Sequence, residues 1–366
     1  MVRVGWVGWV GWTGRGFAVM DVLVAGGGPA GLATAILAAR AGMAVTVAEP
    51  RPGPIDKACG EGLMPSALTR LLALGVDPPG RPLLGIRYAD AGHSADALFR
   101  GTPGRGVRRT ALHAALAECA AKEGVIVVPA RVDGFEGHAD HVEAAGMRAR
   151  YLVAADGLHS PIRRACGLDP APGSGSGSDS ARSRFGLRRH YRLEPWADLV
   201  EVHWSDQSEA YVTPVADGLV GVAILGPQRG GFDTRLAAFP ALRERLAGAA
   251  ADGTDRGAGP LRQDVRRRIC ADRVLLVGDA SGYVDALTGE GISVALAQAA
   301  ALVDCLRTGR AGEYERRWRQ VSRKSRALTS GLLWARGNPL LGHRIVPTAA
   351  RLPRVFAAVV NQVAAG

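Results

Sequence analysis

The sequence predicts an α/β protein in which a discontinuous, Rossmann-like nucleotide-binding domain carries an inserted β-sheet domain and is followed by a helical C-terminal region. Three observations predict this fold. Residues 21–49 have the pattern of a strand, a glycine-rich turn, a helix and a second strand, which together form a βαβ unit. Residues 107–169 and 273–278 return to the same kind of pattern. Between these pieces, residues 185–226 change to closely spaced strands with alternating apolar residues.

The nucleotide-binding pattern consists of short apolar strands that alternate with helices. Gly42 marks the end of the first helix, because glycine is common just after a helix C-terminus. The expected elements are, in order, a strand at 21–25, a helix at 32–40, a strand at 44–49, a helix at 110–123, and strands at 125–128, 150–155 and 273–278.

The inserted region has the pattern of a sheet that walls a substrate cavity. Strands are expected at 199–204, 209–214 and 218–225, followed by a helix near 234–250. A Gly/Ser-rich run at 170–184 precedes this sheet and is too polar and flexible to pack. We interpret this run as a hinge or a surface loop.

These patterns divide the chain into four parts. The predicted parts are a disordered or non-native extension at 1–19; the nucleotide-binding domain at 20–75, 105–170 and 270–310; the substrate domain at 76–104 and 185–269; and a helical region at 311–366. The extension repeats a Gly-Trp pair but has neither the long apolar run nor the cleavage site of a targeting segment. Met20 stands at the first strand, so translation from this residue would give a complete domain.

The amino-acid composition indicates which kinds of partner and which cellular compartment to expect. The net charge is +11, but the basic residues are almost all arginine and no helix-turn-helix, zinc-finger or RNA-binding motif is present, so we expect no nucleic-acid partner. The five cysteines are odd in number and lack CxxC or zinc-ligand spacing. We therefore expect a cytoplasmic location, no disulfide framework and no metal site.

The GxGxxG motif at 26–31 follows the first strand and opens the first helix. Its glycines let the backbone turn sharply and approach a pyrophosphate, while the helix start offers free N–H groups. Glu49 ends the second strand, where an acid can bond ribose hydroxyls. Taken alone, the motif also fits a turn without a ligand, or NAD. The cofactor contacts expected in this unit are Gly26, Gly28, Ala30, Gly31 and Glu49.

Two further glycine-containing segments, 156–163 and 278–282, follow later strands of the same domain. Asp279 ends a strand, where its carboxylate can accept hydrogen bonds from sugar hydroxyls. The Gly-Glu-Gly sequence at 289–291 opens another helix, whose N–H groups can stabilise a negative charge. The contacts expected from the second of these segments and from this helix start are Gly278, Asp279, Gly289 and Gly291.

Together, the three segments resemble the FAD-binding set of the flavoprotein monooxygenase and geranylgeranyl reductase superfamily, which has the para-hydroxybenzoate hydroxylase fold. The resemblance covers about residues 20–310. It implies that FAD is the cofactor of the discontinuous domain and that NADPH or NADH is the electron donor. It also implies that Asp156 and Gly157, in a segment similar to the family's DG motif, contact the dinucleotide, and that Asp156 and Arg163 influence the use of the electron donor.

The resemblance also implies roles for further residues. Residues 56–65 are similar to the loop that passes the flavin ring in geranylgeranyl reductase-like proteins, so Cys59 and Gly60 are candidate flavin contacts. Cys59 can equally be an ordinary small buried thiol. Arg109 matches a family arginine that contacts the FAD phosphates, although Arg108 could fill the role.

The third segment departs from the aromatic hydroxylases of this superfamily. Gly282 stands where they usually have a histidine, and Asp285 and Ala286 stand where prolines are usual. The Trp-x-Trp-x-Ile-Pro signature of tryptophan halogenases is absent, which disfavours halogenation.

The resemblance implies an FAD-dependent monooxygenase that uses NAD(P)H and O₂ to hydroxylate an aromatic or polyketide-like small molecule of secondary metabolism. His190, His203 and Tyr211 are candidate catalytic residues, since each could bond a phenolic hydroxyl or help to remove its proton, and each can also be structural. Gly282 and residues 56–65 favour the alternative, a geranylgeranyl reductase-like flavoprotein that reduces C=C bonds of prenyl or other lipids. A flavin-free interaction protein is the third interpretation.

The helix expected at 313–326 is basic and contains Trp318. Such a helix can rest on anionic lipid, which would give a weak peripheral membrane contact and would suit a lipid substrate. It can also cap the nucleotide-binding domain with its apolar side.

Overall fold

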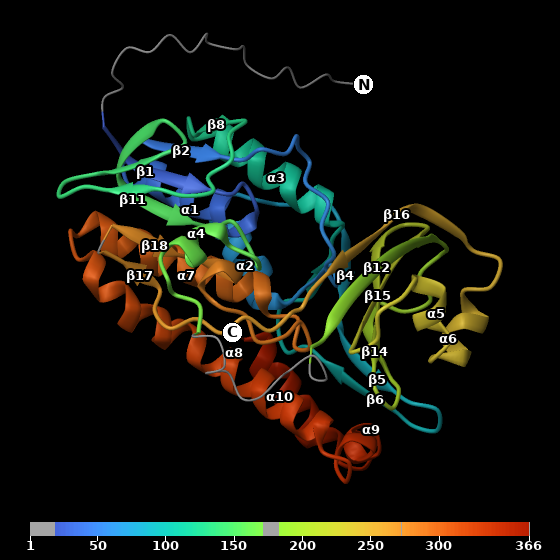
Figure 1. The fold of residues 1–366 in the computed structure, drawn as a ribbon. Helices are drawn as coiled ribbons and strands as arrows, with labels where there is room; N and C mark the ends of the chain where they lie inside the picture. Colours follow the sequence, from blue (N-terminus) through green and yellow to red (C-terminus); the bar gives the residue numbers. More distant parts are fainter. Residues whose placement is uncertain (1–18, 171–182, 272, 366) are drawn as a thin grey trace.

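The computed structural model describes residues 19–170, 183–271 and 273–365 (Figure 1). The predicted extension at 1–19, apart from Val19, and most of the Gly/Ser-rich run at 170–184 lie outside the described residues. The described part forms two large sheets, a small third sheet and a helical C-terminal region. This arrangement confirms the predicted fold class.

The first sheet carries the nucleotide-binding pattern. In spatial order its main strands are β17 (Ile269–Cys270), β18 (Val274–Leu276), β11 (Met147–Ala154), β1 (Met20–Ala25), β2 (Val45–Ala48) and β8 (Ile126–Val128), and a hairpin of β9 (Glu136–Gly137) and β10 (Val142–Ala144) extends β11. The five strands from β18 to β8 are parallel, whereas β17 is antiparallel. Strands that are far apart in the sequence therefore form one continuous sheet.

Helices cover both faces of this sheet, as is usual for parallel strands, and bury its central strands β1, β2 and β18. α1 (Pro29–Arg40) packs against α7 (Gly291–Arg307), and α3 (Arg109–Lys122) lies beside α1. Leu32 and Ile36 of α1 are buried in this layer. The packing fixes the turn between β1 and α1 at the carboxyl edge of the sheet, where ligands bind in such folds.

The second sheet is mostly antiparallel. Its order is β16 (Ala250–Ala258), β12 (Phe185–Arg192), β15 (Leu219–Gly226), β14 (Glu209–Ala216), β13 (Leu199–Trp204), β5 (Gly85–Ala89) and β6 (Ser94–Leu98). A small sheet of β3 (Gly62–Leu63), β7 (Gly104–Gly106) and β4 (Arg81–Leu83), with α2 (Pro65–Ala73), connects the two large sheets. Strands from 85–98 and 185–258 thus share one sheet, while the predicted domain boundaries stay a prediction.

The helical stretch predicted near 234–250 is shorter than expected and is interrupted. The structure has two short helices, α5 (Phe232–Leu236) and α6 (Pro240–Arg245), and the chain then enters β16. Pro240 explains the break, because proline cannot donate the backbone hydrogen bond of a helix interior and instead starts α6.

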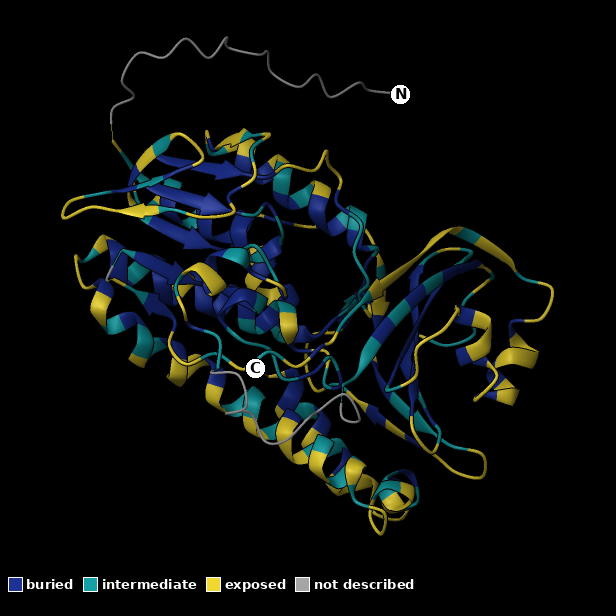
Figure 2. Ribbon diagram, in the orientation of Figure 1, coloured by how far each residue is buried: buried dark blue, intermediate teal, exposed yellow. Residues whose placement is uncertain are grey.

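The helix expected at 313–326 is the first part of α8 (Tyr314–Gly337), which runs from the first sheet towards the second (Figure 1). The Tyr314 hydroxyl donates to Leu276 O at 3.0 Å, and Trp318 Nε1 donates to Ser281 Oγ at 2.9 Å. This half of α8 therefore caps the first sheet with its buried aromatic side chains, while its outer side is exposed (Figure 2).

The chain ends in α9 (Ile345–Arg351) and α10 (Pro353–Ala364), which pack against β6. Asn361 fixes α10 to this edge strand, because its Nδ2 donates to Leu98 O at 2.9 Å and its Oδ1 accepts from the backbone N–H of Arg100 at 2.7 Å. Among the described residues, no helix is both long and apolar enough to cross a membrane.

A buried ion cluster joins α8 to the second sheet. Glu209 of β14 is fully buried and accepts hydrogen bonds from Arg184 Nη2 at 2.5 Å and from Arg336 of α8. Arg184 Nε also donates to Asp285 Oδ2 at 3.0 Å. Removing one member of such a cluster leaves a buried charge without its partner, so we expect the cluster to be essential for stability.

We predict that Glu209→Gln lowers the free energy of unfolding by about 3 kcal/mol or more, because two arginines lose their carboxylate in a buried site. The control is Asp217→Asn, which removes the exposed partner of Arg81 and is expected to change the same quantity by less than about 1 kcal/mol. Urea unfolding followed by circular dichroism measures both. Equal effects of the two variants would contradict the role assigned to the cluster.

Candidate active site

A cavity of about 1150 Å³ extends between the two large sheets and is bordered by the C-terminal helices. One part lies at the carboxyl ends of β1, β11 and β18, and the other lies against the second sheet, α9 and α10. Eleven of the fourteen predicted cofactor contacts line it, namely Gly28, Ala30, Cys59, Gly60, Arg109, Asp156, Gly157, Gly278, Asp279, Gly289 and Gly291. Gly26, Gly31 and Glu49 lie outside the lining.

Two glycines keep the turn between β1 and α1 tight. A Cβ atom at Gly31 would lie 1.9 Å from Gly26 O, and one at Gly26, whose φ is +103°, would lie 2.5 Å from Ala155 O. No side chain fits at either position. The turn therefore approaches β11 closely and leaves Gly28 and Ala30 facing the cavity.

Two helices begin at the cavity with uncapped N-termini. α1 starts after Gly28 and α7 starts after Glu290, and neither start has a side-chain hydrogen bond to its first N–H groups. Gly289 and Gly291, at the start of α7, line the cavity. Free N–H groups and the helix dipole make both ends suitable for phosphate or for a negative charge on a ring.

The structure separates the two candidate arginines. Arg109 lines the cavity and Arg108 does not, although the buried Nε of each has no hydrogen-bond partner among the described residues. Arg108 instead pairs with Asp252 of β16, with 3.0 Å between Nη1 and Oδ2. Arg109 is therefore the better placed of the two for a phosphate ligand, as the sequence analysis prefers.

Two aspartates present carboxylates to the cavity. Burial raises the pKa of Asp156, whose Oδ1 has no partner among the described residues while its Oδ2 accepts from the Ile162 N–H at 3.3 Å. Asp279 Oδ2 lies 3.1 Å from Lys57 Nζ, and both residues line the cavity. Lys57 belongs to the predicted flavin loop, but the sequence analysis assigns it no role.

Arg163 has a structural environment. It is buried and does not line the cavity. Its Nε donates to Asp169 Oδ1 at 2.5 Å and its Nη2 donates to Gln263 Oε1 at 3.0 Å. Its expected influence on the electron donor stays a prediction.

Glu49 is buried beneath Arg51. Its carboxylate accepts from the Gly27 N–H at 2.8 Å and from two nitrogens of Arg51 at 2.8 and 2.9 Å. Burial favours the neutral acid, but these hydrogen bonds prevail and hold the pKa of Glu49 below its usual value. Arg51, and not Glu49, lines the cavity, so the predicted ribose contact of Glu49 stays a prediction.

The loop at 56–65 connects the cavity to the second sheet through a buried pair. Glu61 lines the cavity with φ +60°, and its Oε2 lies 2.5 Å from His190 Nε2 of β12. Its Oε1 accepts from the Arg109 N–H at 2.8 Å. His190 Nδ1 lies 2.9 Å from Arg188 Nη1, and Arg188 in turn pairs with Asp56. Glu61, which the sequence analysis did not assign, thus stands between His190 and the cavity.

The three predicted catalytic residues have different positions. Tyr211 lines the cavity, its hydroxyl donates to Leu287 O at 2.9 Å, and burial raises its pKa well above the usual value. His190 lies behind Glu61 and outside the lining. His203 pairs with Glu201 at 3.1 Å and also lies outside the lining. Of the three, the structure gives only Tyr211 direct access to a ligand.

The part of the cavity beyond the glycine segments is apolar. Tyr88, Phe356 and aliphatic residues of the second sheet line it, and the Tyr88 ring lies 5.2 Å from that of Trp204 and 4.8 Å from that of Phe356. In α10 and at its N-cap, residues at helical spacing line the same space: Leu352, Val355, Phe356, Val359, Val360 and Val363. This spacing was the signal in the sequence that could have identified α10 as a wall of the site.

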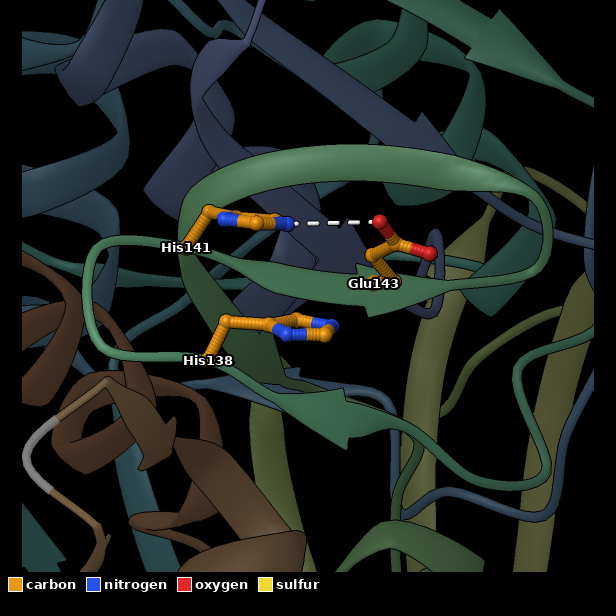
Figure 3. A group of neighbouring side chains, drawn as sticks. All are labelled: His138, His141 and Glu143. Carbon is orange, nitrogen blue, oxygen red and sulfur yellow. Dashed lines mark hydrogen bonds and ion pairs between the residues drawn. The ribbon is translucent and has the colours of Figure 1, made fainter.

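Three residues with metal-binding side chains meet on the β9–β10 hairpin, away from the cavity (Figure 3). The ligand atoms of His138, His141 and Glu143 lie within 4.8 Å of one another. However, His141 already bonds two carboxylates, with Asp140 at Nδ1 and Glu143 at Nε2. Both ring nitrogens of His141 therefore already have hydrogen-bond partners, without a metal ion.

The chain belongs to the FAD binding domain family, whose model matches residues 19–317. It is 28% identical over 309 residues to the menaquinone reductase of Mycobacterium tuberculosis, with 75% of this chain and 74% of that protein covered. A local match of 56 residues at 54% identity covers 15% of this chain and 14% of the menaquinone reductase of Mycolicibacterium smegmatis.

Two further relatives match over most of their length. The digeranylgeranylglycerophospholipid reductase 1 of Methanopyrus kandleri is 30% identical over 302 residues, with 75% of this chain and 77% of that protein covered. The aurachin C monooxygenase/isomerase of Stigmatella aurantiaca is 27% identical over 328 residues, with 78% and 80% covered. The chain is thus an FAD-binding oxidoreductase, as expected.

Among solved structures, the flavin-dependent brominase Bmp2 superposes with a TM-score of 0.79 at 16% identity, and the match covers 95% of this chain and 94% of that one. At this identity the likeness concerns the fold alone. It confirms that both large sheets and the C-terminal helices belong to one known architecture.

The cavity fits FAD in three independent ways. The turn at Gly26–Gly31 is so tight that a side chain at Gly26 or Gly31 would collide with neighbouring backbone atoms, which is typical of a turn that approaches a pyrophosphate. Arg109 Nε and Asp156 Oδ1 are buried polar atoms without partners among the described residues, as expected beside a phosphate and a hydroxyl or amide group. The start of α7 adds N–H groups at the far end. Arg109, Asp279 and the α1 and α7 N-termini would hold the cofactor.

We predict that Gly31→Ala lowers the FAD content of the purified protein by about tenfold or more, because the new methyl group would collide with Gly26 O. Gly134→Ala is the matched control, since a Cβ there meets no atom within 4 Å. The ratio of flavin to protein absorbance measures the content, and circular dichroism checks the fold. A fully yellow, folded Gly31→Ala protein would refute the placement of the cofactor.

We also predict that Glu61→Gln and His190→Gln lower turnover by about a hundredfold while FAD content stays unchanged, because the pair can hold a proton at the cavity wall. His203→Gln is expected to change turnover by less than about twofold, since His203 bonds Glu201 and neither side chain lines the cavity. Steady-state rates over a range of pH measure both effects. A loss at His203 equal to that at His190 would contradict the assignment.

Proposed function

We propose that the protein is an FAD-dependent reductase of a carbon–carbon double bond in an apolar, prenyl-lipid-like or quinone-like molecule. The observation that carries this proposal is the apolar part of the cavity, which α10 and the second sheet enclose with aliphatic and aromatic side chains. A long hydrocarbon chain gains free energy by leaving water for such a space. The sequence analysis gave this reaction as its alternative.

The relatives support the same class of substrate. Their names contain menaquinone, a digeranylgeranyl glycerophospholipid and aurachin C, and two of these three names specify reduction. The flavin loop at 56–65, whose resemblance to geranylgeranyl reductases motivated the alternative, contributes Cys59, Gly60 and Glu61 to the cavity lining. Both lines of support are independent of the apolar wall.

Bound FAD would supply two-electron chemistry between the electron donor and the substrate. The protein's residues would do the rest: the glycine turn and Arg109 hold the cofactor, and the apolar wall orients the substrate and excludes water. Reduction of a double bond also requires a proton. Glu61, hydrogen-bonded to the buried His190, can hold one at the wall of the cavity.

A monooxygenase remains the second candidate, because one relative is named as a monooxygenase and three tyrosines line the cavity. Besides Tyr211, these are Tyr88 and Tyr283, whose pKa values burial also raises, so that both keep their protons. Neutral hydroxyls can orient an aromatic or polyketide-like substrate through hydrogen bonds. In this reaction O₂ would be consumed and NAD(P)H would be oxidised.

For either reaction we propose NADPH or NADH as the electron donor and a cytoplasmic location. The exposed Gln228 and Arg229 are part of the cavity lining and give a polar, cationic approach from solvent. A peripheral membrane contact of the C-terminal helices fits a lipid substrate.

We predict that the FAD-loaded protein with NADPH or NADH converts a prenylated quinone or a geranylgeranyl lipid without O₂, and that the product gains two hydrogens. The measurement is mass spectrometry of anaerobic reactions, with parallel reactions under ¹⁸O₂. Incorporation of ¹⁸O, with no anaerobic product, would replace the reductase proposal by the monooxygenase. Heat-inactivated protein is the control.

A further inference from the structure

We propose that the gap between α8 and α10 is a port that docks on an anionic lipid bilayer and admits a lipid substrate from the bilayer into the cavity. The docking part of this inference is independent of the reaction. The identity of the entering molecule rests on the proposed function.

The evidence for the port is a set of residues that line the cavity and are also exposed to solvent. Leu352, which immediately precedes α10, and Val355 and Val359 of α10 belong to the cavity lining, yet their exposed fractions are 51%, 57% and 50%. Their spacing of three and four residues places them on one face of the helix. Large apolar side chains in this position connect the interior of the cavity with the surface.

The opposite side of the gap is formed by α8. Ala327 and Gly331 line the cavity and are exposed, and their small side chains leave the gap open. Trp334 lies three residues after Gly331, on the same side of α8, and is 67% exposed. Tryptophan favours the boundary between lipid and water, because its ring is apolar and its N–H is polar.

Further apolar residues surround this opening. Leu340 and Leu341, which follow α8, are 70% and 36% exposed. Leu98, at the end of β6, is 61% exposed and lies next to α10, because Asn361 bonds its carbonyl oxygen. An apolar surface that continues into an apolar cavity is unusual for a face that meets only water.

The positive charge of this region favours binding to an anionic surface. After Glu315 the sequence contains no Asp or Glu, whereas arginine recurs as far as Arg354 at the start of α10. Arg344, Arg351 and Arg354 are exposed, and none of them forms an ion pair within the described residues. Exposed arginines beside apolar side chains match the headgroups and the acyl region of an anionic monolayer.

The cavity also opens to solvent at a second place, where polar side chains line it. At Gln228 and Arg229 the exposed lining is polar. A water-soluble electron donor suits this side, whereas the α8–α10 side suits a molecule that leaves a lipid phase. No described helix can cross a membrane, so the contact would be at the bilayer surface.

The test uses the full FAD-loaded chain and sucrose-loaded vesicles of phosphatidylcholine with phosphatidylglycerol. We expect co-sedimentation of the wild type, and a loss of vesicle affinity of about tenfold or more when three arginines of the port are reversed in charge. The matched control has the same net charge but reverses exposed arginines on α2, α4 (Pro161–Ala165) and α6. The port variant is Arg344→Glu, Arg351→Glu and Arg354→Glu, and the control variant is Arg70→Glu, Arg164→Glu and Arg243→Glu.

A second measurement locates the contact. Brominated acyl chains quench tryptophan fluorescence at short range, so we expect quenching in the wild type that Trp334→Phe largely removes. Equal vesicle affinity of the port and control variants, or quenching that does not depend on Trp334, would overturn the port. Because neither measurement needs turnover, a protein that binds as expected but does not reduce prenyl substrates would contradict the proposed function alone.

Discussion

The site depends on the buried carboxylate of Glu209, which lies where three parts of the molecule meet. It belongs to the second sheet, it accepts a hydrogen bond from Arg336 of α8, and through Arg184 it is linked to Asp285 near the start of α7. Ion pairs in a buried site are sensitive to geometry, since each charge needs its partner to offset desolvation. The cluster therefore fixes the separation between the two sheets and the position of α8, and with them the width of the cavity.

The two ends of the cavity differ in polarity, although buried polar atoms without partners among the described residues also occur on the side of the second sheet, at Arg188 Nε, Arg235 Nε and Trp204 Nε1. At the glycine segments, Arg109 and Asp156 keep buried polar atoms without partners among the described residues, which is unfavourable until a ligand bonds them. At the other end, the hydroxyl of Tyr211 already donates to Leu287 O, and the remaining walls are mostly apolar. The polar end thus selects a cofactor by hydrogen bonds and charge, whereas the apolar end selects its substrate mainly by shape and hydrophobicity.

The sequence predicted the cofactor end well because its constraints are local. A turn that allows no Cβ at Gly31, a strand that ends at Asp279 and a helix that opens at Gly291 each leave a pattern within a few residues. The substrate end depends on contacts between distant residues, such as Glu61 with His190, and these leave no local pattern. His190 and His203 were therefore chosen by residue type, although both lie outside the cavity lining, and the helical stretch at 234–250 was predicted without allowing for Pro240.

The position of α10 connects the polarity of the cavity to the way a substrate arrives. A substrate that is stable only in lipid would lose much of its free-energy gain if it had to pass through water before binding. The exposed faces of Leu352, Val355 and Val359 shorten that passage, because the same side chains contact both the surface and the interior. A water-soluble electron donor gains nothing from such a surface, and the polar lining at Gln228 and Arg229 offers it a separate approach. Two routes of opposite polarity into one cavity are thus what a reaction between a soluble donor and an apolar acceptor requires.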